Sequence, residues 1–185
     1  MRGEIFNEFL EFAAEVIGPD AAAALTTRDG ERVRPMRYET AGRYDLAELV
    51  HLADGVAGVR SESRSAVLTR FGTHLFGYFA ALYPTFLDES VSAIGLLSSI
   101  DTYVHGELRK LYPDAEFPGF ECTPLPGGGL VMSYRSARPL ADLADGLIRG
   151  CIEHFGDPIR VVREDLPGEP GTSARFVLVV EPDRN

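Results

Sequence analysis

The sequence predicts an α+β fold, in which an N-terminal helical subdomain packs on a C-terminal subdomain with a four-stranded antiparallel sheet and a helix. Up to about residue 118, apolar residues recur every three or four positions, which is the period of amphipathic helices. Beyond that point, short extended runs alternate with turns rich in glycine and proline. With 185 residues and 45% hydrophobic content, the chain can bury the core of one domain or of two subdomains that share an interface.

The first part of the chain predicts helices. The apolar positions place them over residues 5–17, 46–53, 61–70, 72–83 and 88–111. Ser61 is a candidate N-cap for the third helix. The fourth is expected to end before Pro84, because the residue that precedes a proline disfavours the helical conformation. The stretch from residue 26 to residue 43 is polar and shows no periodicity, so we expect a long loop there.

The second part predicts a hairpin, a helix and two further strands. The strands are expected over residues 120–124, 130–138, 159–164 and 174–181. Gly127-Gly128-Gly129 is the predicted hairpin turn. We expect the helix to begin at Pro139, whose fixed φ angle suits a first helical position, and to end at Gly156. Its predicted buried stripe consists of Leu140, Leu143, Leu147, Ile148, Cys151, Ile152 and Phe155.

Composition and charge argue against several classes of protein. The formal net charge of −10, from 28 acidic and 18 basic residues, opposes nucleic-acid binding, which needs a basic surface. No run of about 18 apolar residues could span a bilayer, and glutamates interrupt the first apolar segment, unlike a secretion signal. Cys122 and Cys151 have no spacing typical of a zinc site or a disulfide framework. We therefore expect a protein of the reducing cytoplasm, with no membrane and no nucleic acid as partner.

His105 is a candidate metal ligand. On the predicted helix, Asp101 lies one turn before it, and Ile94 and Leu97 lie on the same side, so the imidazole belongs on or near a buried stripe. One interpretation is a core histidine bonded to a carbonyl or to Asp101. The other is a single axial iron ligand, whose tautomer a neighbouring acceptor fixes. The histidine alone leaves both open.

Tyr134, Ser136 and Arg138 form a candidate site for carboxylates. In a strand, alternate side chains share a face, so a phenol, a hydroxyl and a guanidinium are expected to converge. Such a row can donate several hydrogen bonds to carboxylates, and the arginine can bind one bidentately. The positive end of the helix expected to start at Pro139 points to the same neighbourhood. A solvated strand face is the alternative.

These residues belong to a longer series of motifs that resembles a known family. In chain order the motifs are Met1-Arg2-Gly3-Glu4-Ile5-Phe6, Phe71-Gly72, Tyr83-Pro84, Ile100-Asp101-x-x-Val104-His105, Lys110-Leu111-Tyr112-Pro113-Asp114-Ala115-x-x-Pro118, Tyr134-x-Ser136-x-Arg138 and Gly146-Leu147-Ile148-x-Gly150. The chain resembles the H-NOX (haem nitric oxide/oxygen-binding, HNOB) domain, which also forms the haem domain of soluble guanylate cyclase. The match covers nearly the whole chain, although residues 19–43 show no family pattern.

The resemblance implies a single H-NOX domain over residues 1–185, with residues 1–60 as a helical distal subdomain, residues 61–185 as a proximal α+β subdomain, and haem b between them. His105 would be the proximal iron ligand. Tyr134, Ser136 and Arg138 would hold the haem propionates, and Pro118 would press on the porphyrin and help to distort it.

The resemblance also predicts which gas is bound. Oxygen-binding members have a hydrogen-bonding tyrosine on the helix after the propionate motif, and the matching position here is Leu143. The other pocket positions by resemblance are all apolar: Ile5, Phe9, Leu75, Phe79 and Leu147. We therefore expect nitric oxide and carbon monoxide to bind and oxygen to be excluded. An oxygen-binding variant would need an unrecognised donor, for which His74 and Tyr78 lie nearby.

By resemblance, the chain would be a sensor subunit without an output domain of its own. Nitric oxide bound opposite His105 would weaken the bond between iron and histidine, and the change would regulate a histidine kinase or a cyclic-di-GMP enzyme in trans. The serious alternative is a haem-free protein-interaction module on the same scaffold. An enzyme is not expected, because His105 and Asp101 are accompanied by no nucleophile motif, phosphate loop or catalytic carboxylate pair.

Overall fold

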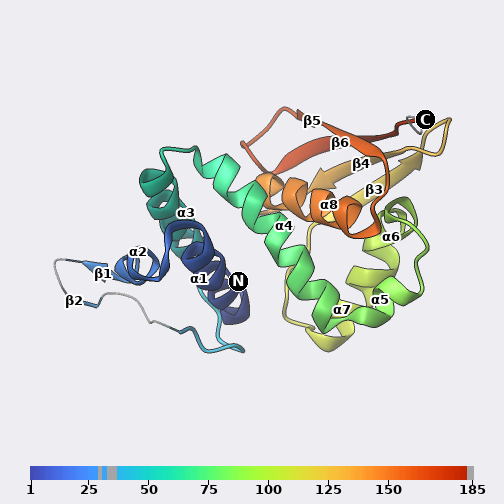
Figure 1. Cartoon of the computed structure of the whole chain (residues 1–185). Coiled ribbons are helices and arrows are strands. Elements are labelled where there is room, and N and C mark those ends of the chain that lie inside the picture. Colours follow the sequence, from blue (N-terminus) through green and yellow to red (C-terminus); the bar gives the residue numbers. More distant parts are fainter. Residues whose placement is uncertain (29–30, 33–36, 183–185) are drawn as a thin grey trace. The chain divides into compact units, whose positions relative to one another are not determined.

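The computed structural model describes residues 1–28, 31–32 and 37–182, and the chain divides into two compact units, residues 1–71 and 72–185 (Figure 1). The boundary falls inside the longest helix, α4 (Arg64–Leu82). Within the described residues, no helix is both long enough and apolar enough to cross a membrane.

The first unit is mainly helical. Its elements are α1 (Gly3–Ile17), α2 (Pro19–Ala24), β1 (Thr27–Arg28), β2 (Glu31–Arg32), α3 (Leu46–Arg60) and the beginning of α4. Phe9 and Phe71 are fully buried and meet edge to face, with ring centroids 4.9 Å apart. The predicted loop at 26–43 contains the short antiparallel pair β1–β2, while residues 29–30 and 33–36 of that loop lie outside the described part.

The helix boundary near residue 61 differs from the prediction. Ser61 ends α3 in the left-handed conformation, with φ 55°, and its backbone N–H donates to the carbonyl of Ala57. The next helix is instead capped by Ser63, whose Oγ accepts a hydrogen bond of 3.1 Å from the backbone N–H of Ala66. From there α4 runs without the break predicted around residue 71. Both serines suit a cap, and the local backbone decides between them.

The predicted helix over 88–111 is wrong, because this stretch is divided into short pieces. They are α5 (Pro84–Asp88), α6 (Ala93–Ser98), a π-helical turn η1 (Ile100–Val104) and α7 (His105–Leu111). Serine hydroxyls lie at both ends of α6, where they bond to local backbone groups that a continuous helix would use. Ser92 Oγ accepts from the N–H of Gly95 at 3.1 Å and begins α6, and Ser99 Oγ donates to the carbonyl of Leu96 at 3.0 Å near its end.

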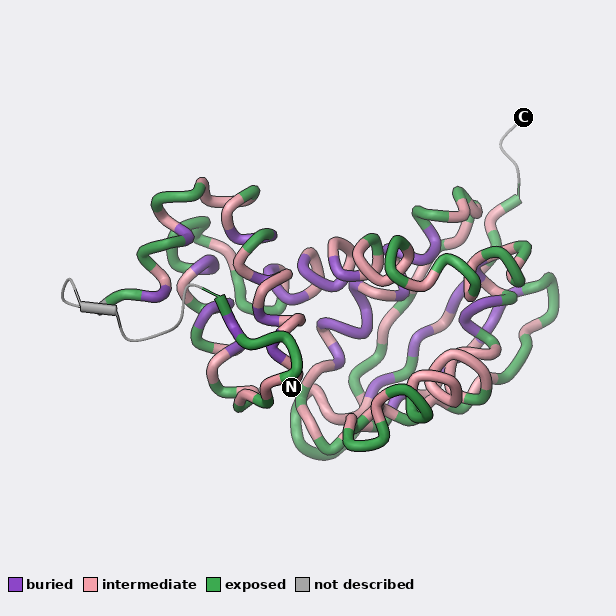
Figure 2. Tube along the Cα trace, turned by 90° about the horizontal axis from the view of Figure 1, so that it is seen from below, coloured by how far each residue is buried: buried purple, intermediate pink, exposed green. Residues whose placement is uncertain are grey.

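The second unit contains the predicted four-stranded antiparallel sheet, so the α+β fold class is confirmed. The strands are β3 (Gly119–Pro124), β4 (Leu130–Arg135), β5 (Ile159–Asp165) and β6 (Ser173–Val180), in the spatial order β3-β4-β6-β5. Helices α6 and α8 (Ala141–Phe155) share one core with this sheet (Figures 1 and 2). On the central strands, buried residues such as Met132 and Phe176 are paired in register.

The predicted strand over 130–138 ends early, at Arg135. The N–H of Ser136 donates to the carbonyl of Thr172 at 2.8 Å, and the N–H of Arg138 donates to Ser136 Oγ at 3.0 Å, so the chain turns there. Pro139 lies in this turn and not at the first helical position, since α8 begins at Ala141. The predicted end of α8 at Gly156 is confirmed, with a left-handed φ of 67°.

Helices α4 and α8 approach each other through glycines. A Cβ atom at Gly72 would lie 2.4 Å from the carbonyl oxygen of Leu143, and one at Gly150 would lie 2.7 Å from the Cβ of Phe76. Thr73 Oγ1 adds a hydrogen bond of 3.2 Å to the carbonyl of Gly146. The two backbones are therefore in direct contact, which only glycine permits at position 72.

Candidate functional site

His105 lies at the start of α7, directly after the π-helical turn η1. Its side chain is 12% exposed, and its ring centroid lies 5.1 Å from that of Phe117 and 6.1 Å from that of Phe120. Burial lowers the pKa of the imidazole, although Asp101 opposes this effect. The ring is therefore neutral near pH 7, and a neutral imidazole is the form that binds a metal.

The carboxylate of Asp101 lies between His105 and Arg109. Its Oδ1 is 3.5 Å from Nδ1 of His105, and that buried nitrogen makes no hydrogen bond within the part of the chain that the structure describes. The same Oδ1 accepts a hydrogen bond of 2.9 Å from Arg109 Nη2. Asp101 and the backbone of Pro118 both act to raise the pKa of the imidazole, so both sequence-based interpretations of His105, a core histidine bonded to a carbonyl or to Asp101 and an iron ligand, fit this geometry.

Tyr134, Ser136 and Arg138 lie close together, although only Tyr134 is on the strand. Tyr134 is 1% exposed, and burial raises the pKa of its phenol, while Ser136 and the backbone of Leu140 oppose this rise by hydrogen bonding to it. The Arg138 guanidinium makes an ion pair of 2.7 Å with Glu116, a carboxylate that is 71% exposed. The motif therefore already places one cation beside a carboxylate group.

Aromatic rings link His105 to this motif. Phe120 on β3 lies 6.1 Å from His105 and 5.4 Å from Tyr134, its partner in register on β4. Half-buried Pro118 lies in the chain between Phe117 and Phe120. The structure thus places a neutral imidazole, an apolar wall and a set of hydrogen-bond donors within one unit, as a flat apolar ligand with acidic edges would require.

The residues predicted for a distal pocket are apolar in both units. Those of the second unit lie on the two helices that meet at Gly72: Leu75 and Phe79 on α4, and Leu143 and Leu147 on α8. Leu75 and Leu143 are buried, with 2% and 6% exposed, and the other two are half-buried. In the first unit, α1 carries half-buried Ile5 and fully buried Phe9. The alternative donors His74 and Tyr78 are half-buried on α4.

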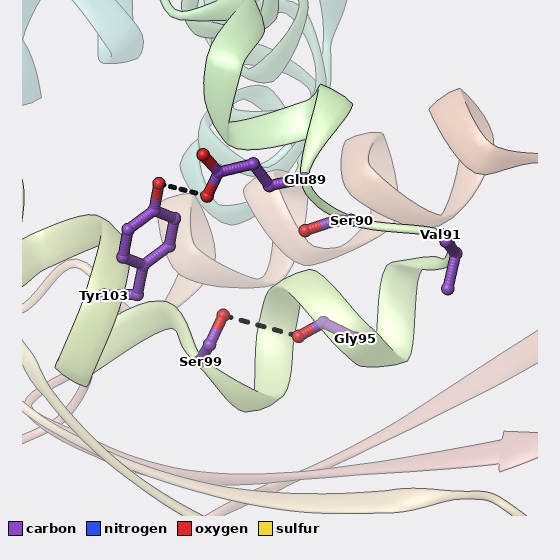
Figure 3. Close-up of a pocket in the computed structure, with 6 residues that line it drawn as sticks. All are labelled: Glu89, Ser90, Val91, Gly95, Ser99 and Tyr103. Atoms are coloured by element: carbon purple, nitrogen blue, oxygen red, sulfur yellow. Dashed lines mark hydrogen bonds between the residues drawn. The ribbon is translucent and has the colours of Figure 1, made fainter.

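A separate hollow of about 250 Å³ lies on the surface of the second unit (Figure 3). It is lined by Glu89, Ser90, Val91, Gly95, Ser99 and Tyr103. Its main side-chain contact is the Tyr103 hydroxyl, which donates to Glu89 Oε2 at 2.5 Å. None of the predicted site residues lines it. Among the described residues, no group of three or more His, Cys, Asp or Glu side chains is placed to hold a metal ion.

Sequence reasoning missed four residues of the site: Phe117, Phe120, Glu116 and Arg109. The two phenylalanines flank Pro118, and an aromatic pair on either side of a predicted apolar wall was the available signal. No sequence signal pointed to Glu116 or Arg109, because their contacts depend on how the backbone turns after β4 and within η1.

Known proteins similar to this chain share its fold and are described as H-NOX proteins. The sequence model of the family described as Haem-NO-binding matches residues 2–163. The structure of an Fe(II) unliganded H-NOX protein from K. algicida is 27% identical, with a TM-score of 0.86, and the match covers 100% of this chain and 99% of that one. An IWP-051-bound H-NOX from Shewanella woodyi in the Fe(II)CO state is 29% identical, with a TM-score of 0.80 and coverage of 100% and 97%. An H-NOX protein from S. oneidensis in the Fe(II)NO state, 23% identical with a TM-score of 0.85 over 98% of this chain and 100% of that one, shows the fold alone. A search of curated proteins gives no match.

Proposed function

Because the chain belongs to the haem-NO-binding (H-NOX) family, we propose that it is a haem-based sensor of nitric oxide and carbon monoxide that signals to a separate protein. H-NOX domains bind haem, sense diatomic gases and are not themselves enzymes. The observation that carries the proposal is the arrangement of His105, Phe120 and Tyr134 in one continuous set of ring contacts. We also propose that residues 1–185 act as one domain.

The residues present fit haem b. His105 offers a buried, neutral imidazole as the iron ligand. Arg138 suits a propionate, because its guanidinium already binds the carboxylate of Glu116, which is exposed and free to exchange. Tyr134 and Ser136 would hold the same edge, and Pro118 would form the apolar wall. Bound haem would supply the ferrous iron to which the gases bind.

The selectivity for nitric oxide and carbon monoxide follows from the absence of a donor in the predicted pocket. Leu143 stands where oxygen-binding members have a tyrosine, and its neighbours on α4 and α8 are leucines and a phenylalanine. Dioxygen takes on negative charge as it binds and needs a hydrogen bond, whereas the other two gases bind without one. An apolar site cannot offset that charge.

The signal would begin at His105. This residue joins η1 to α7, so a change in its position would move a segment made of short helical pieces. A partner responds only if it binds the two states with different affinity. We propose a histidine kinase or a cyclic-di-GMP enzyme as that partner, and a cytoplasmic location, which the free thiols of Cys122 and Cys151 support.

Absorption spectra test the proposal directly. The purified protein is reconstituted with haem and examined in the ferrous, air-exposed and nitric-oxide-treated forms, beside His105→Gly and a His51→Gly control on the exposed side of α3. We expect a Soret band that shifts with nitric oxide and not with air. If well-folded protein shows no Soret band, the haem proposal is wrong and the alternative, a haem-free protein-interaction module, is favoured. A stable oxygenated spectrum would instead overturn the selectivity and direct attention to His74 and Tyr78.

A further inference from the structure

Arg109 is held next to His105 by three contacts. Its Nη2 donates to Asp101 Oδ1 at 2.9 Å, and its Nη1 donates to the backbone carbonyl of Asp101 at 3.2 Å. Its guanidinium carbon lies 5.7 Å from the centre of the Phe117 ring, which packs against His105. The side chain is therefore fixed in place although 45% of it is exposed.

A single oxygen, Asp101 Oδ1, faces both Arg109 and His105. The arginine is within hydrogen-bond distance at 2.9 Å, while the histidine nitrogen Nδ1 is 3.5 Å away and makes no hydrogen bond to any described residue. A carboxylate oxygen that accepts a charge-assisted hydrogen bond is a weaker acceptor for a second donor. Arg109 thus competes with His105 for the group that would otherwise bond to the imidazole.

The π-helical turn makes this competition possible. Residues eight apart on a regular α-helix are offset by about 80° around the axis. Between Asp101 and Arg109 the chain contains η1, whose wider turn reduces that offset and lets the arginine reach back along the helix to the carboxylate. The same turn places the Asp101 carboxylate beside His105, with Oδ1 3.5 Å from Nδ1.

We propose that Arg109 is a positioning residue that weakens the bond between His105 and iron by holding the Asp101 carboxylate away from Nδ1. A hydrogen bond from the second nitrogen of a metal-bound histidine to a carboxylate makes the imidazole a stronger ligand. Arg109 prevents that bond, so His105 would hold the iron of bound haem less strongly and would be released more readily in the presence of nitric oxide. This inference rests on the proposed function of His105 as the iron ligand.

The test compares Arg109→Gln with Lys110→Gln, a matched control on the neighbouring, 70% exposed side chain, whose ion pair is with Glu107. Resonance Raman spectra of the ferrous protein report the iron–histidine stretch. Arg109→Gln should move this band to higher frequency. After nitric oxide is added, some molecules keep the iron–histidine bond and others lose it, and Arg109→Gln should raise the ratio of the first to the second about tenfold. Lys110→Gln should leave both unchanged. In an Asp101→Asn background, Arg109→Gln should have no further effect.

A second readout needs no haem. In the apoprotein, at a fixed pH at which the ring is neutral, the ¹⁵N shift of His105 Nδ1 should move toward the hydrogen-bonded value in Arg109→Gln and stay in place in Lys110→Gln. Thermal unfolding of each apoprotein shows whether it folds, and Arg109→Met, which also removes the charged donor to Asp101, serves if the glutamine variant does not fold.

Three outcomes would overturn the inference. The first is an iron–histidine stretch that stays at the same frequency in haem-loaded Arg109→Gln. The second is a Raman shift on Arg109→Gln that is equal in the wild-type and the Asp101→Asn backgrounds. The third is an unchanged ¹⁵N chemical shift of His105 Nδ1 in the Arg109→Gln apoprotein. The failure of the proposed function looks different, since wild-type protein would then show no Soret band at all, while the apoprotein measurement would still decide the role of Arg109.

Discussion

The two sides of the candidate site in the second unit are built differently. His105 lies on a series of short helices with a π-helical turn, and a half-exposed arginine holds its nearest carboxylate. Tyr134 lies on a central strand that is paired on both sides, and it is almost fully buried. Irregular, partly exposed segments open at low free energy, whereas central strands do not. The comparison predicts that the segment around His105 moves more readily than the strand of Tyr134, as the proposed sensor would require.

Removal of the imidazole should have the largest effect. His105→Gly should lower the haem content of purified protein about tenfold or more, because the remaining contacts cannot supply an iron ligand. Added imidazole should restore the Soret band, since the rest of the site is unchanged. The haem-to-protein absorbance ratio is the measurement, with exposed His51→Gly as control. Full haem content and an unaltered spectrum in His105→Gly would place the ligand elsewhere.

On the opposite side, Arg138→Ala should weaken haem binding without changing the ligand to iron. The loss of a charge-assisted hydrogen bond corresponds to an affinity about 10- to 100-fold lower. Transfer of haem to an acceptor apoprotein measures this loss, and the absorption spectrum should keep the wild-type form. Arg135→Ala is the matched control, because that residue is exposed and follows Tyr134 on the other face of the strand. Equal haem loss in both variants would mean that position 138 has no special role.

The contact between α4 and α8 supports the sheet side, and glycine variants measure its contribution. Gly72→Ala should lower the free energy of unfolding by about 1 to 3 kcal/mol, because the new Cβ meets the backbone of Leu143 and Gly146. Gly77→Ala on the same helix meets no atom within 4 Å and should raise it by about 0.5 to 1 kcal/mol. Urea unfolding of the apoproteins gives both values. The same sign for the two variants would contradict the close approach.

The smallest effect is expected at Glu116. Glu116→Gln removes the carboxylate that pairs with Arg138 and leaves the guanidinium available to a propionate. Since exposed ion pairs contribute about 0.2 to 1 kcal/mol, haem affinity should rise up to about fivefold. Haem transfer measures it, and the gain should disappear in an Arg138→Ala background. A fall in affinity would show that Glu116 contributes to the site directly.

Much of the fold was predictable because its signals are local. Most of the predicted stripe of α8 (Leu143, Ile148, Cys151 and Ile152), its end at Gly156 and the alternation along β5 and β6 depend only on neighbouring residues, whereas Leu140 of that stripe lies before the helix. The division of residues 84–111 was not predictable, because serine hydroxyls can serve a helix end or an exposed position, and a π-helical turn has no sequence pattern of its own. The end of β4 was missed because the backbone N–H of Arg138 bonds to Ser136 Oγ in a local turn, which the alternation of residue types does not indicate.

The candidate site divides in the same way. His105, Tyr134, Ser136 and Arg138 were found from residue type and from a family resemblance, and their roles at haem stay predictions. Their partners were not found, because an arginine or a glutamate reaches a carboxylate or a guanidinium only through the particular path of the backbone. The pairing of Arg138 with Glu116 joins two loops, and no spacing rule connects those loops.

The glycine contact between α4 and α8 also has a mechanical consequence. Where side chains separate two helices, a small shift of one can be absorbed by a change of rotamer, and the other helix stays where it was. At Gly72 no side chain lies between the helix backbone and the carbonyl of Leu143, so there is nothing to rearrange. A closely packed backbone contact is nearly incompressible. A displacement of α4 at this point should therefore displace α8 by a similar amount, and Leu143 and Leu147 should move with α8.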